Sequence, residues 1–328
     1  MTSSASGTSA TPANLETAFL GEERRYAREE VCRLAGIELS EARRLWRAMG
    51  FADVGDDVPV FTDADVTALR LVSSLRRRGM LDLETTVHLT RALGRMTGRL
   101  VEWQLQTLVE RVAADGVAPE LAFRAGVEQA ATLTPELEQL LVYVWRRKLA
   151  AAANRTLWDA DEDTELDQAT VGFADLVGYT RLARRLPESE FAAVVETFEA
   201  RTSDIVAAAG GRVVKTVGDE VLFLAGPPAV GADIGLQISA AMRADPILPD
   251  VRVGLATGNV LHRLGDVFGT TVNLASRLTT YGRRGRVYVD SAMAAALDGE
   301  PGYRVRRAWM RPLPGVGLVE AWLLRRRG

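Results

Sequence analysis

An acidic stretch, WDADEDTELDQ at residues 158–168, divides this sequence into two parts with different patterns. It holds six acidic side chains and no basic one, which is typical of a solvated segment that does not enter a core. Before it, apolar residues recur at helical spacing, whereas beyond it short strand-like runs alternate with helical ones. We therefore expect two domains joined by an acidic linker, and a chain of 328 residues is long enough for both to bury a core.

Residues 23–157 have a helical pattern throughout, so we expect an all-helical domain. In FTDADVTALRLVSSLRRRG, Thr62 and Asp65 are spaced as a capping box at the start of one helix. A further helix is predicted to begin at Thr134, with Pro135 at its first position, where the missing N–H costs nothing.

The sequence beyond the linker predicts a second domain, residues 169–328, of class α+β. Strands, helices and tight turns alternate in it, which favours one layer of helices on a mostly antiparallel sheet. A hairpin is expected at 211–225, because Gly218 before Asp219 accepts the positive φ that a tight turn needs. The other strands are expected at 170–177, 250–261, 285–290, 302–310 and 318–325, and helices at 187–211, 228–243 and 270–282.

Composition argues against several classes of protein. The net charge of -3 gives no indication of nucleic-acid binding, and the single cysteine, Cys32, can form neither an intrachain disulfide nor a cysteine-rich metal site. Apolar runs end in charged residues well short of the roughly 20 residues that a bilayer span needs. Residues 1–22 are polar and lack the features of a secretory signal, so we expect a disordered tail and a cytoplasmic protein.

Asp175 and Asp219 are expected at strand ends, where carboxylates can bind metal ions. Asp175 closes the strand in GFADLVGYT, before a Gly178-Tyr179-Thr180 turn that opens a helix and presents N–H groups to a phosphate. Two carboxylates at neighbouring strand ends can hold hard cations while phosphate oxygens complete the coordination, as in two-metal phosphoryl transfer. The alternative is that Asp175 caps a helix and Asp219 only belongs to a turn.

The segment GDVFGTTVNLASRL, residues 265–278, carries Asp266, Asn273 and Arg277. Asn273 and Arg277 are four residues apart and share a helix face, which suits binding of an anionic oxygen and an adjacent hydroxyl. A solvated polar face is the alternative.

Taken together, FADLVGYT, VVKTVGDE and GDVFGTTVNLASR, in this order and spacing, resemble the catalytic domain of class III nucleotidyl cyclases. The resemblance extends from about Val171 to Leu324. It implies a ferredoxin-like cyclase fold and two catalytic domains packed head to tail in a homodimer, with composite active sites at their interface. The implied reaction converts ATP to 3′,5′-cyclic AMP and pyrophosphate.

The resemblance also implies roles for the residues of the first two motifs. Asp175 and Asp219 match the carboxylates that bind two Mg²⁺ or Mn²⁺ ions. Lys215 and Asp266 match a buried pair that reads the adenine ring, where guanylyl cyclases usually carry Glu and Cys. Because the family takes metal ligands and base readers from different subunits, Lys215 and Asp219 would serve different active sites.

In the third motif, Asn273 matches the residue that orients the ribose, and Arg277 the one that stabilises charge on the α-phosphate as the 3′-hydroxyl attacks. One position departs from the family, because Pro314 stands where many relatives carry a lysine that contacts the terminal phosphates. The residues that could replace it are Arg311, Arg283 and Arg284.

The helical half loosely resembles the winged helix-turn-helix of MerR-type regulators, with Arg43, Arg44 and Arg47 on the second helix. Acidic residues surround these arginines and no basic stripe is present, so no nucleic acid partner is expected. A helical domain before a cyclase domain is similar to soluble actinobacterial adenylyl cyclases with an N-terminal inhibitory domain.

That similarity implies that the helical domain controls whether two catalytic domains reach a productive register, as an autoinhibitory device. The candidate signals are a fatty acid or other apolar ligand in the bundle core, or a proton taken up by His88, His262 or the linker. A nucleotide-binding module without turnover and a DNA-binding regulator are the alternative functions.

Overall fold

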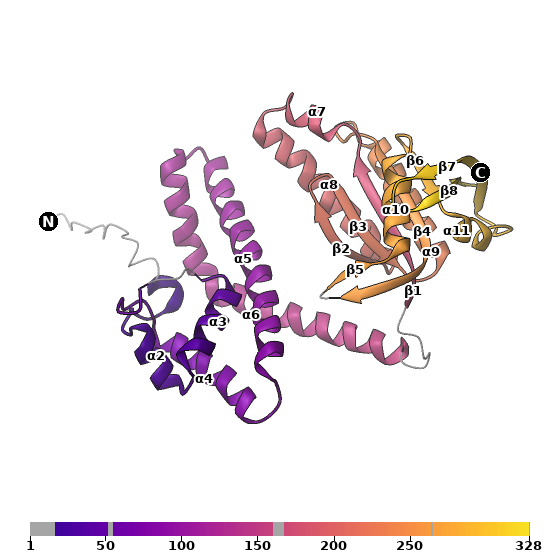
Figure 1. The fold of residues 1–328 in the computed structure, drawn as a ribbon. Helices are drawn as coiled ribbons and strands as arrows, with labels where there is room; N and C mark the ends of the chain where they lie inside the picture. The colour runs from indigo at the N-terminus through magenta and orange to yellow at the C-terminus, as the bar shows by residue number, and fades with distance from the viewer. Residues whose placement is uncertain (1–16, 52–54, 160–166, 264, 328) are drawn as a thin grey trace. The chain divides into compact units, whose positions relative to one another are not determined.

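The computed structural model describes residues 17–51, 55–159, 167–263 and 265–327. The chain divides into two compact units, Met1–Asp161 and Glu162–Gly328, which we call the helical unit and the sheet unit (Figure 1). Most of the predicted acidic linker, residues 160–166, lies outside the described residues, while 158–159 end a helix and 167–168 begin a strand.

Among its described residues, the helical unit contains five helices of eight residues or more. They are α2 (Arg28–Ala35), α3 (Leu39–Met49), α4 (Asp63–Arg77), α5 (Leu83–Ala114) and α6 (Pro119–Asp159). Leu45 and Trp46 lie in its core, where the Trp46 ring stacks on Phe61 with the ring centroids 4.6 Å apart. The predicted capping box of Thr62 and Asp65 is confirmed at the start of α4. Among the described residues, no helix combines the length and the apolar composition needed to cross a bilayer.

Residues 17–20 form one helical turn, so the disordered tail predicted for residues 1–22 does not include them. The amide of Gly21 donates to the carbonyl of Thr17 (2.8 Å), and the Glu22 carboxylate accepts from the amide of Ala64 at the start of α4 (3.0 Å). The amides of Gly21 and Ala64 thus have hydrogen-bond acceptors within the chain, which composition alone does not predict.

The prediction that a helix begins at Thr134 is wrong, because α6 runs continuously through this position with Pro135 in its interior. The Thr134 hydroxyl donates to the carbonyl of Ala130 one turn back (2.9 Å), which is the bond of a mid-helix threonine and not of an N-cap. Proline removes one helical hydrogen bond and its ring crowds the preceding turn, and Figure 1 shows α6 changing direction along its length.

The sheet unit is built on one eight-stranded sheet with the order β2-β3-β1-β4-β6-β8-β7, and β5 pairs with β4 off this path. The strands are β1 (Asp167–Leu176), β2 (Arg212–Val217), β3 (Glu220–Ala225), β4 (Val251–Arg263), β5 (Asp266–Phe268), β6 (Arg286–Val289), β7 (Tyr303–Leu313) and β8 (Gly317–Arg326). Strands β4 and β6 run parallel and the other described pairs are antiparallel. The sheet is therefore mixed, with the mostly antiparallel pairing that the sequence predicts.

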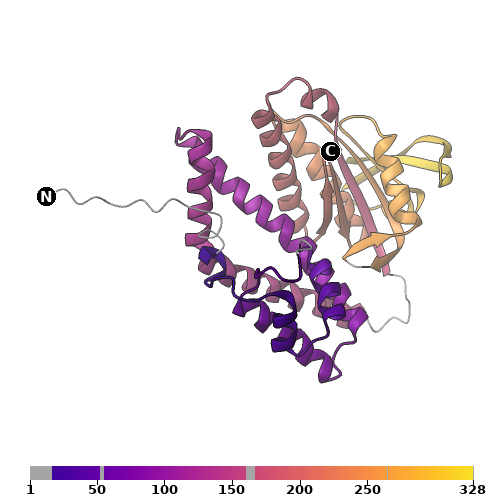
Figure 2. The same cartoon turned by 60° about the vertical axis from the view of Figure 1, so that its left-hand side comes forward.

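Helices cover both faces of this sheet (Figures 1 and 2), so the single layer of helices expected from the sequence is wrong. The helices are α7 (Tyr179–Ala183), α8 (Glu188–Ala208), α9 (Pro228–Ala244), α10 (Thr270–Thr280) and α11 (Ser291–Ala296). Phe198 of α8 and Ile234 of α9 share a buried cluster with Leu176 of β1. Ala275 of α10 instead packs with Phe173, whose side chain leaves β1 on the opposite face.

The helix expected after the Gly178-Tyr179-Thr180 turn is present as α7. Two short elements are not predicted from the sequence, β5 and α11. They contain three and six residues, and runs of this length carry too little periodicity to be recognised. The strand β5 matters most, because it carries Asp266 and pairs with the end of β4.

Candidate active site

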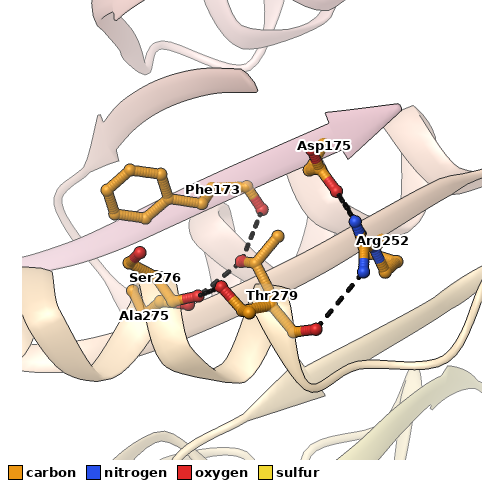
Figure 3. A network of polar contacts seen from close by, with 7 residues as sticks. Phe173, Asp175, Arg252, Ala275, Ser276 and Thr279 are labelled. Atoms are coloured by element: carbon orange, nitrogen blue, oxygen red, sulfur yellow. Dashed lines mark hydrogen bonds and ion pairs between the residues drawn. The ribbon is translucent and has the colours of Figure 1, made fainter. Parts of the chain in front are cut away.

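A row of charged residues crosses three neighbouring strands at one end of the sheet. Asp175 of β1 lies opposite Glu220 of β3 on one side and Arg252 of β4 on the other. Residues paired across strands point to the same face. Nε of Arg252 donates to Oδ2 of Asp175 (2.9 Å), and its second guanidinium nitrogen pairs with the same oxygen (Figure 3). The predicted metal carboxylate is therefore neutralised by an arginine of its own chain.

The hairpin turn brings Asp219 to the same end of the sheet. Gly218 has φ of 62°, the left-handed value that the sequence predicts for this turn. The carbonyl of Asp219 accepts from the amide of Leu176 (3.0 Å), directly after Asp175 in β1. The structure thus places the two predicted metal carboxylates together, although they are 44 residues apart in the sequence.

The electrostatics of this cluster suit a cation. Burial raises the pKa of Asp175, with the nearby Asp219 adding to the rise, while Arg252 opposes it. Burial raises the pKa of Glu220 to about 7, helped by the charges of Asp175 and Asp219. Three acids with one close arginine leave negative charge uncompensated when all ionise, so added positive charge would stabilise their ionised forms.

The residues present fit metal ions that take part of their coordination from a ligand. Among the described residues, no group of three or more His, Cys, Asp or Glu side chains is arranged to hold a metal by itself. Mg²⁺ is commonly held by one or two carboxylates together with water and phosphate oxygens. Asp175 and Asp219 match that pattern.

Lys215 and Asp266 also meet. Nζ of Lys215 in β2 lies 2.5 Å from Oδ2 of Asp266 in β5, across 51 residues of sequence. Burial of Asp266 works to raise its pKa, but Lys215 and the amide of Val267 outweigh it and hold the pKa below its usual value. The pair is less buried than expected, with 43% of the Lys215 side chain and 30% of the Asp266 side chain exposed, because β2 forms one edge of the sheet.

Helix α10 carries Asn273 on its exposed side and a half-buried Arg277. The helix lies close to the sheet, since a Cβ on Gly254 of β4 would come within 2.4 Å of the Thr279 amide nitrogen. The Thr279 hydroxyl donates to the carbonyls of Ala275 (3.0 Å) and of Phe173 in β1 (3.3 Å), as Figure 3 shows. These contacts fix α10 against the strand that carries Asp175.

Arg252 connects the two parts of the site. Besides its pair with Asp175, its guanidinium donates to the carbonyl of Thr280, the last residue of α10 (3.3 Å). Sequence reasoning did not single out this residue or Glu220. One sequence feature could have identified Arg252: it stands between Val251 and Val253, which are both buried. An arginine inside an otherwise apolar strand needs a partner.

The turn Gly178-Tyr179-Thr180 opens α7, a helix of only five residues, with Gly178 at φ 84°. The Tyr179 ring packs against the Phe191 ring of α8, with the ring centroids 5.0 Å apart. A Cβ on Gly218 would lie 3.8 Å from the Tyr179 hydroxyl, so this turn and the hairpin tip are neighbours. Phosphate binding by its N–H groups stays a prediction.

Arg311 has partners within the chain. Its guanidinium carbon lies 4.4 Å from the ring centroid of Tyr281 and 4.3 Å from that of Trp309, and the guanidinium donates to the Tyr281 carbonyl (3.3 Å). Such stacking holds it at the end of α10. Of the other candidates to replace the lysine, Arg284 pairs with Asp250 (3.1 Å) and Arg283 is exposed.

Two of the three arginines of the helix-turn-helix resemblance form ion pairs. Arg43 pairs with Asp56 (2.6 Å), and Arg44 pairs with Glu84 of α5 (2.6 Å). Partners within the chain reduce the positive charge that a DNA backbone would meet.

The family model and the sequence relatives agree on one family. Residues 162–326 match the family model described as the adenylate and guanylate cyclase catalytic domain. The chain is 43% identical to an adenylate cyclase of Streptomyces coelicolor, over 95% of this chain and 89% of that protein. It is 39% identical to an adenylate cyclase of Glutamicibacter nicotianae (96% and 82%), and 29% identical to a pH-sensitive adenylate cyclase of Mycobacterium tuberculosis (94% and 80%). The solved adenylyl cyclase CyaB from P. aeruginosa aligns with 49% of this chain and 94% of its own, at 21% identity and a TM-score of 0.45.

Proposed function

The chain belongs to the family of adenylate and guanylate cyclase catalytic domains, and we propose that it is an adenylate cyclase that converts ATP to 3′,5′-cyclic AMP and pyrophosphate. The observation that carries the proposal is the ion pair of Lys215 with Asp266, which brings together residues of two separate motifs. The names of the Streptomyces and Glutamicibacter relatives, which match nearly the whole chain, support the same reaction.

A lysine beside an aspartate discriminates between purines. The ammonium group donates a hydrogen bond and the carboxylate accepts one, which matches the ring nitrogen N1 and the amino group of adenine. Guanine presents a donor at N1 and an acceptor at the neighbouring oxygen, so the same pair would meet the wrong group at both positions. A site with buried polar groups left unpaired rejects such a ligand strongly.

Other side chains of the chain would bind and orient the rest of ATP. Asn273 would hold the ribose, and Arg277 would stabilise the charge that develops on the α-phosphate. Asp175 and Asp219 would hold two divalent metal ions, Mg²⁺ or Mn²⁺, which when bound lower the pKa of the 3′-hydroxyl and neutralise the triphosphate.

Arg252 is our candidate for the phosphate contact that Pro314 cannot make. Arg252 donates to the Asp175 carboxylate, and Asp175 would hold a metal ion in the loaded site. The Arg252 guanidinium would then be free to donate to phosphate oxygens beside that carboxylate. Arg311 fits this role less well because its guanidinium is stacked between two aromatic rings.

We further propose that the active form is a head-to-tail homodimer in the cytoplasm, with metal carboxylates from one copy and Lys215, Asp266, Asn273 and Arg277 from the other. Such a site is sensitive to small displacements, since misplacing reacting groups by about 1 Å can cost roughly 100-fold in rate. The helical unit would control that register, in answer to an apolar ligand or a proton. A chain shortened to begin near Asp167 should then differ in activity from the full chain, and equal activity in all conditions would refute this control.

The direct test of function is product formation by the purified full chain. With Mn²⁺ and ATP we expect cyclic AMP and pyrophosphate in equal amounts, and much slower turnover of GTP. Nucleotide binding without product, in Mg²⁺ and in Mn²⁺ across pH 5 to 8, would instead support the silent nucleotide-binding alternative.

A further inference from the structure

Helix α5 carries two apolar stripes, of which one is covered. On the covered side, Gly94 lies against the backbone of Met49 in α3, and Val109 lies against Gly126 of α6, at distances that leave no room for a Cβ on either glycine. The second stripe, which we call the α5 seam, is largely exposed. It consists of Leu89 (56% exposed), Leu93 (61%), Met96 (71%), a half-buried Leu100 and Trp103 (61%).

The spacing of the α5 seam indicates what kind of surface covers it. Its residues follow one another by four, three, four and three positions, which is the heptad spacing that keeps one stripe facing a partner helix in a coiled coil. The positions beside it on one flank are Thr90, Thr97 and Gln104, so on that side no like charges oppose the approach of an identical helix. Repeated apolar residues at this spacing favour a helix as the partner, not a sheet or a loop.

The sheet unit offers no such helix among its described residues. Its exposed large apolar side chains lie in strands and in turns or caps. They are Val217, Ile247, Leu261, Phe268, Tyr281, Met310 and Leu318. A helix with the required stripe is available on α5 of a second copy.

The second half of α6 supports the same conclusion. Six consecutive residues from Leu140 to Trp145 are exposed large apolar side chains, and Leu149 follows one turn later. Six consecutive positions cover the full circumference of a helix. A helix that is apolar on all sides is enclosed in a larger core, so residues 140–149, the α6 apolar segment, need a partner on several sides.

The exposed area is large enough for a stable dimer. Burying one large apolar side chain removes roughly 60–120 Å² from water, so the eleven exposed side chains of the α5 seam and the α6 apolar segment offer on the order of 1,000 Å² per copy. A stable interface buries about 800 Å² per partner. Monomeric proteins rarely expose contiguous apolar patches beyond a few hundred Å².

We propose that the α5 seam and the α6 apolar segment form an interface with the same surface of a second copy, in which the two α5 seams pack on each other. The pairing is isologous, as in most symmetric dimers. The proposal does not depend on catalytic activity. Its consequence is that the helical units hold two sheet units at high effective concentration, whether or not the sheet units are in productive register.

Site-specific cross-linking tests the pairing in the full chain. Cys32 is the only cysteine and is buried, so a cysteine introduced by Met96→Cys is the reactive one. Met96 is the middle residue of the seam and meets its own copy in both the parallel and the antiparallel arrangement, within the reach of a disulfide. Arg91→Cys is the matched control, because Arg91 is exposed on the opposite side of α5. We expect oxidation to cross-link Met96→Cys at least tenfold faster, and equal rates would overturn the proposal.

Four further variants test the orientation of the two helices and the energetics of the interface. In the antiparallel arrangement Leu89→Cys cross-links to Trp103→Cys of the other copy, whereas in the parallel one Leu89→Cys cross-links to itself. Met96→Glu should raise the dissociation constant of the dimer at least tenfold in sedimentation equilibrium, with helix content unchanged, whereas Arg91→Glu should leave it unchanged. A Met96→Glu dimer as tight as the parent would show that the seam is covered by something else. Neither readout requires ATP turnover, so failure here is distinguishable from failure of the proposed reaction.

Discussion

The helical unit and the sheet unit leave different groups without partners. In the sheet unit, large side chains such as Phe198 and Phe223 are fully buried, while the charged groups near Asp175 stay open to a ligand. In the helical unit the ion pairs are closed within the chain, as for Arg43 and Arg44, while apolar stripes stay exposed on α5 and α6. The sheet unit thus buries its large apolar side chains and keeps charged groups at one end of the sheet, whereas the helical unit leaves apolar side chains exposed. In the two dimer contacts proposed above, a second copy would satisfy both, through charge in the sheet unit and through apolar burial in the helical unit.

Removing Arg277 should have the largest effect. We expect Arg277→Ala to lower kcat by about 10²–10³-fold, the usual cost of losing one preorganised group at a developing charge. The melting temperature should stay unchanged because the side chain is not part of the core. The measurement is steady-state turnover of ATP beside thermal unfolding, with Arg304→Ala, an exposed arginine of β7, as the control. A clear fall in the melting temperature of Arg277→Ala would contradict this expectation, because it would show that Arg277 also stabilises the fold of the sheet unit.

Breaking the purine-reading pair should have the next largest effect. Lys215→Met leaves Asp266 without its partner, so we expect kcat/KM for ATP to fall about 100-fold and the preference over GTP to shrink. Asp266→Asn should give a comparable loss, and the double variant less than the product of the two, because the residues act as a pair. Full additivity in this cycle would contradict the pairing.

The acid cluster should make the sheet unit less stable as the pH rises. Glu220 has a pKa near 7 in the fold and an ordinary value in the unfolded chain, so the folded state binds more protons between these values. The free energy of unfolding should therefore decrease as the pH rises from about 4.5 to about 7, by roughly 1 kcal/mol after allowance for solvent screening.

Glu220→Gln should flatten this dependence, as followed by chemical unfolding across the pH range. The exposed Glu196→Gln in α8 is the matched control and should leave it unchanged. A parent chain whose stability rises over the same range would show that other groups dominate.

Removing an exposed ion pair of the helical unit should have the smallest effect. Arg44 and Glu84 are both largely exposed, and surface pairs contribute little because water and salt screen them. We expect Arg44→Ala to shift the Tm by less than about 2 °C and to leave any affinity for duplex DNA unchanged. A salt-dependent loss of DNA binding in this variant would revive the MerR-like reading.

Whether a site residue could be predicted from the sequence depends on how far it lies along the chain from the residues that it contacts. Local motifs located Asp175, Asp219 and Asn273, because each stands at a strand end or on a short helix that the pattern predicts. Arg252 was missed because its partner Asp175 is 77 residues away and only the register of β1 and β4 aligns them.

The exposed stripes were missed for another reason. Apolar spacing on α5 predicts a buried face, and it cannot tell whether that face is buried within one chain or between two. At Pro135, local rules favour a helix start, whereas α6 continues through this residue.

The central claim is that each active site takes its metal carboxylates from one copy and its phosphate-stabilising arginine from the other. It is tested by mixing Asp175→Ala protein with Arg277→Ala protein, each expected to be inactive alone, after subunit exchange has been demonstrated by mass or fluorescence. A mixed dimer restores one intact site of two, so a random mixture should recover about a quarter of the activity of the parent chain by statistical pairing. No recovery in fully exchanged dimers would contradict the composite site.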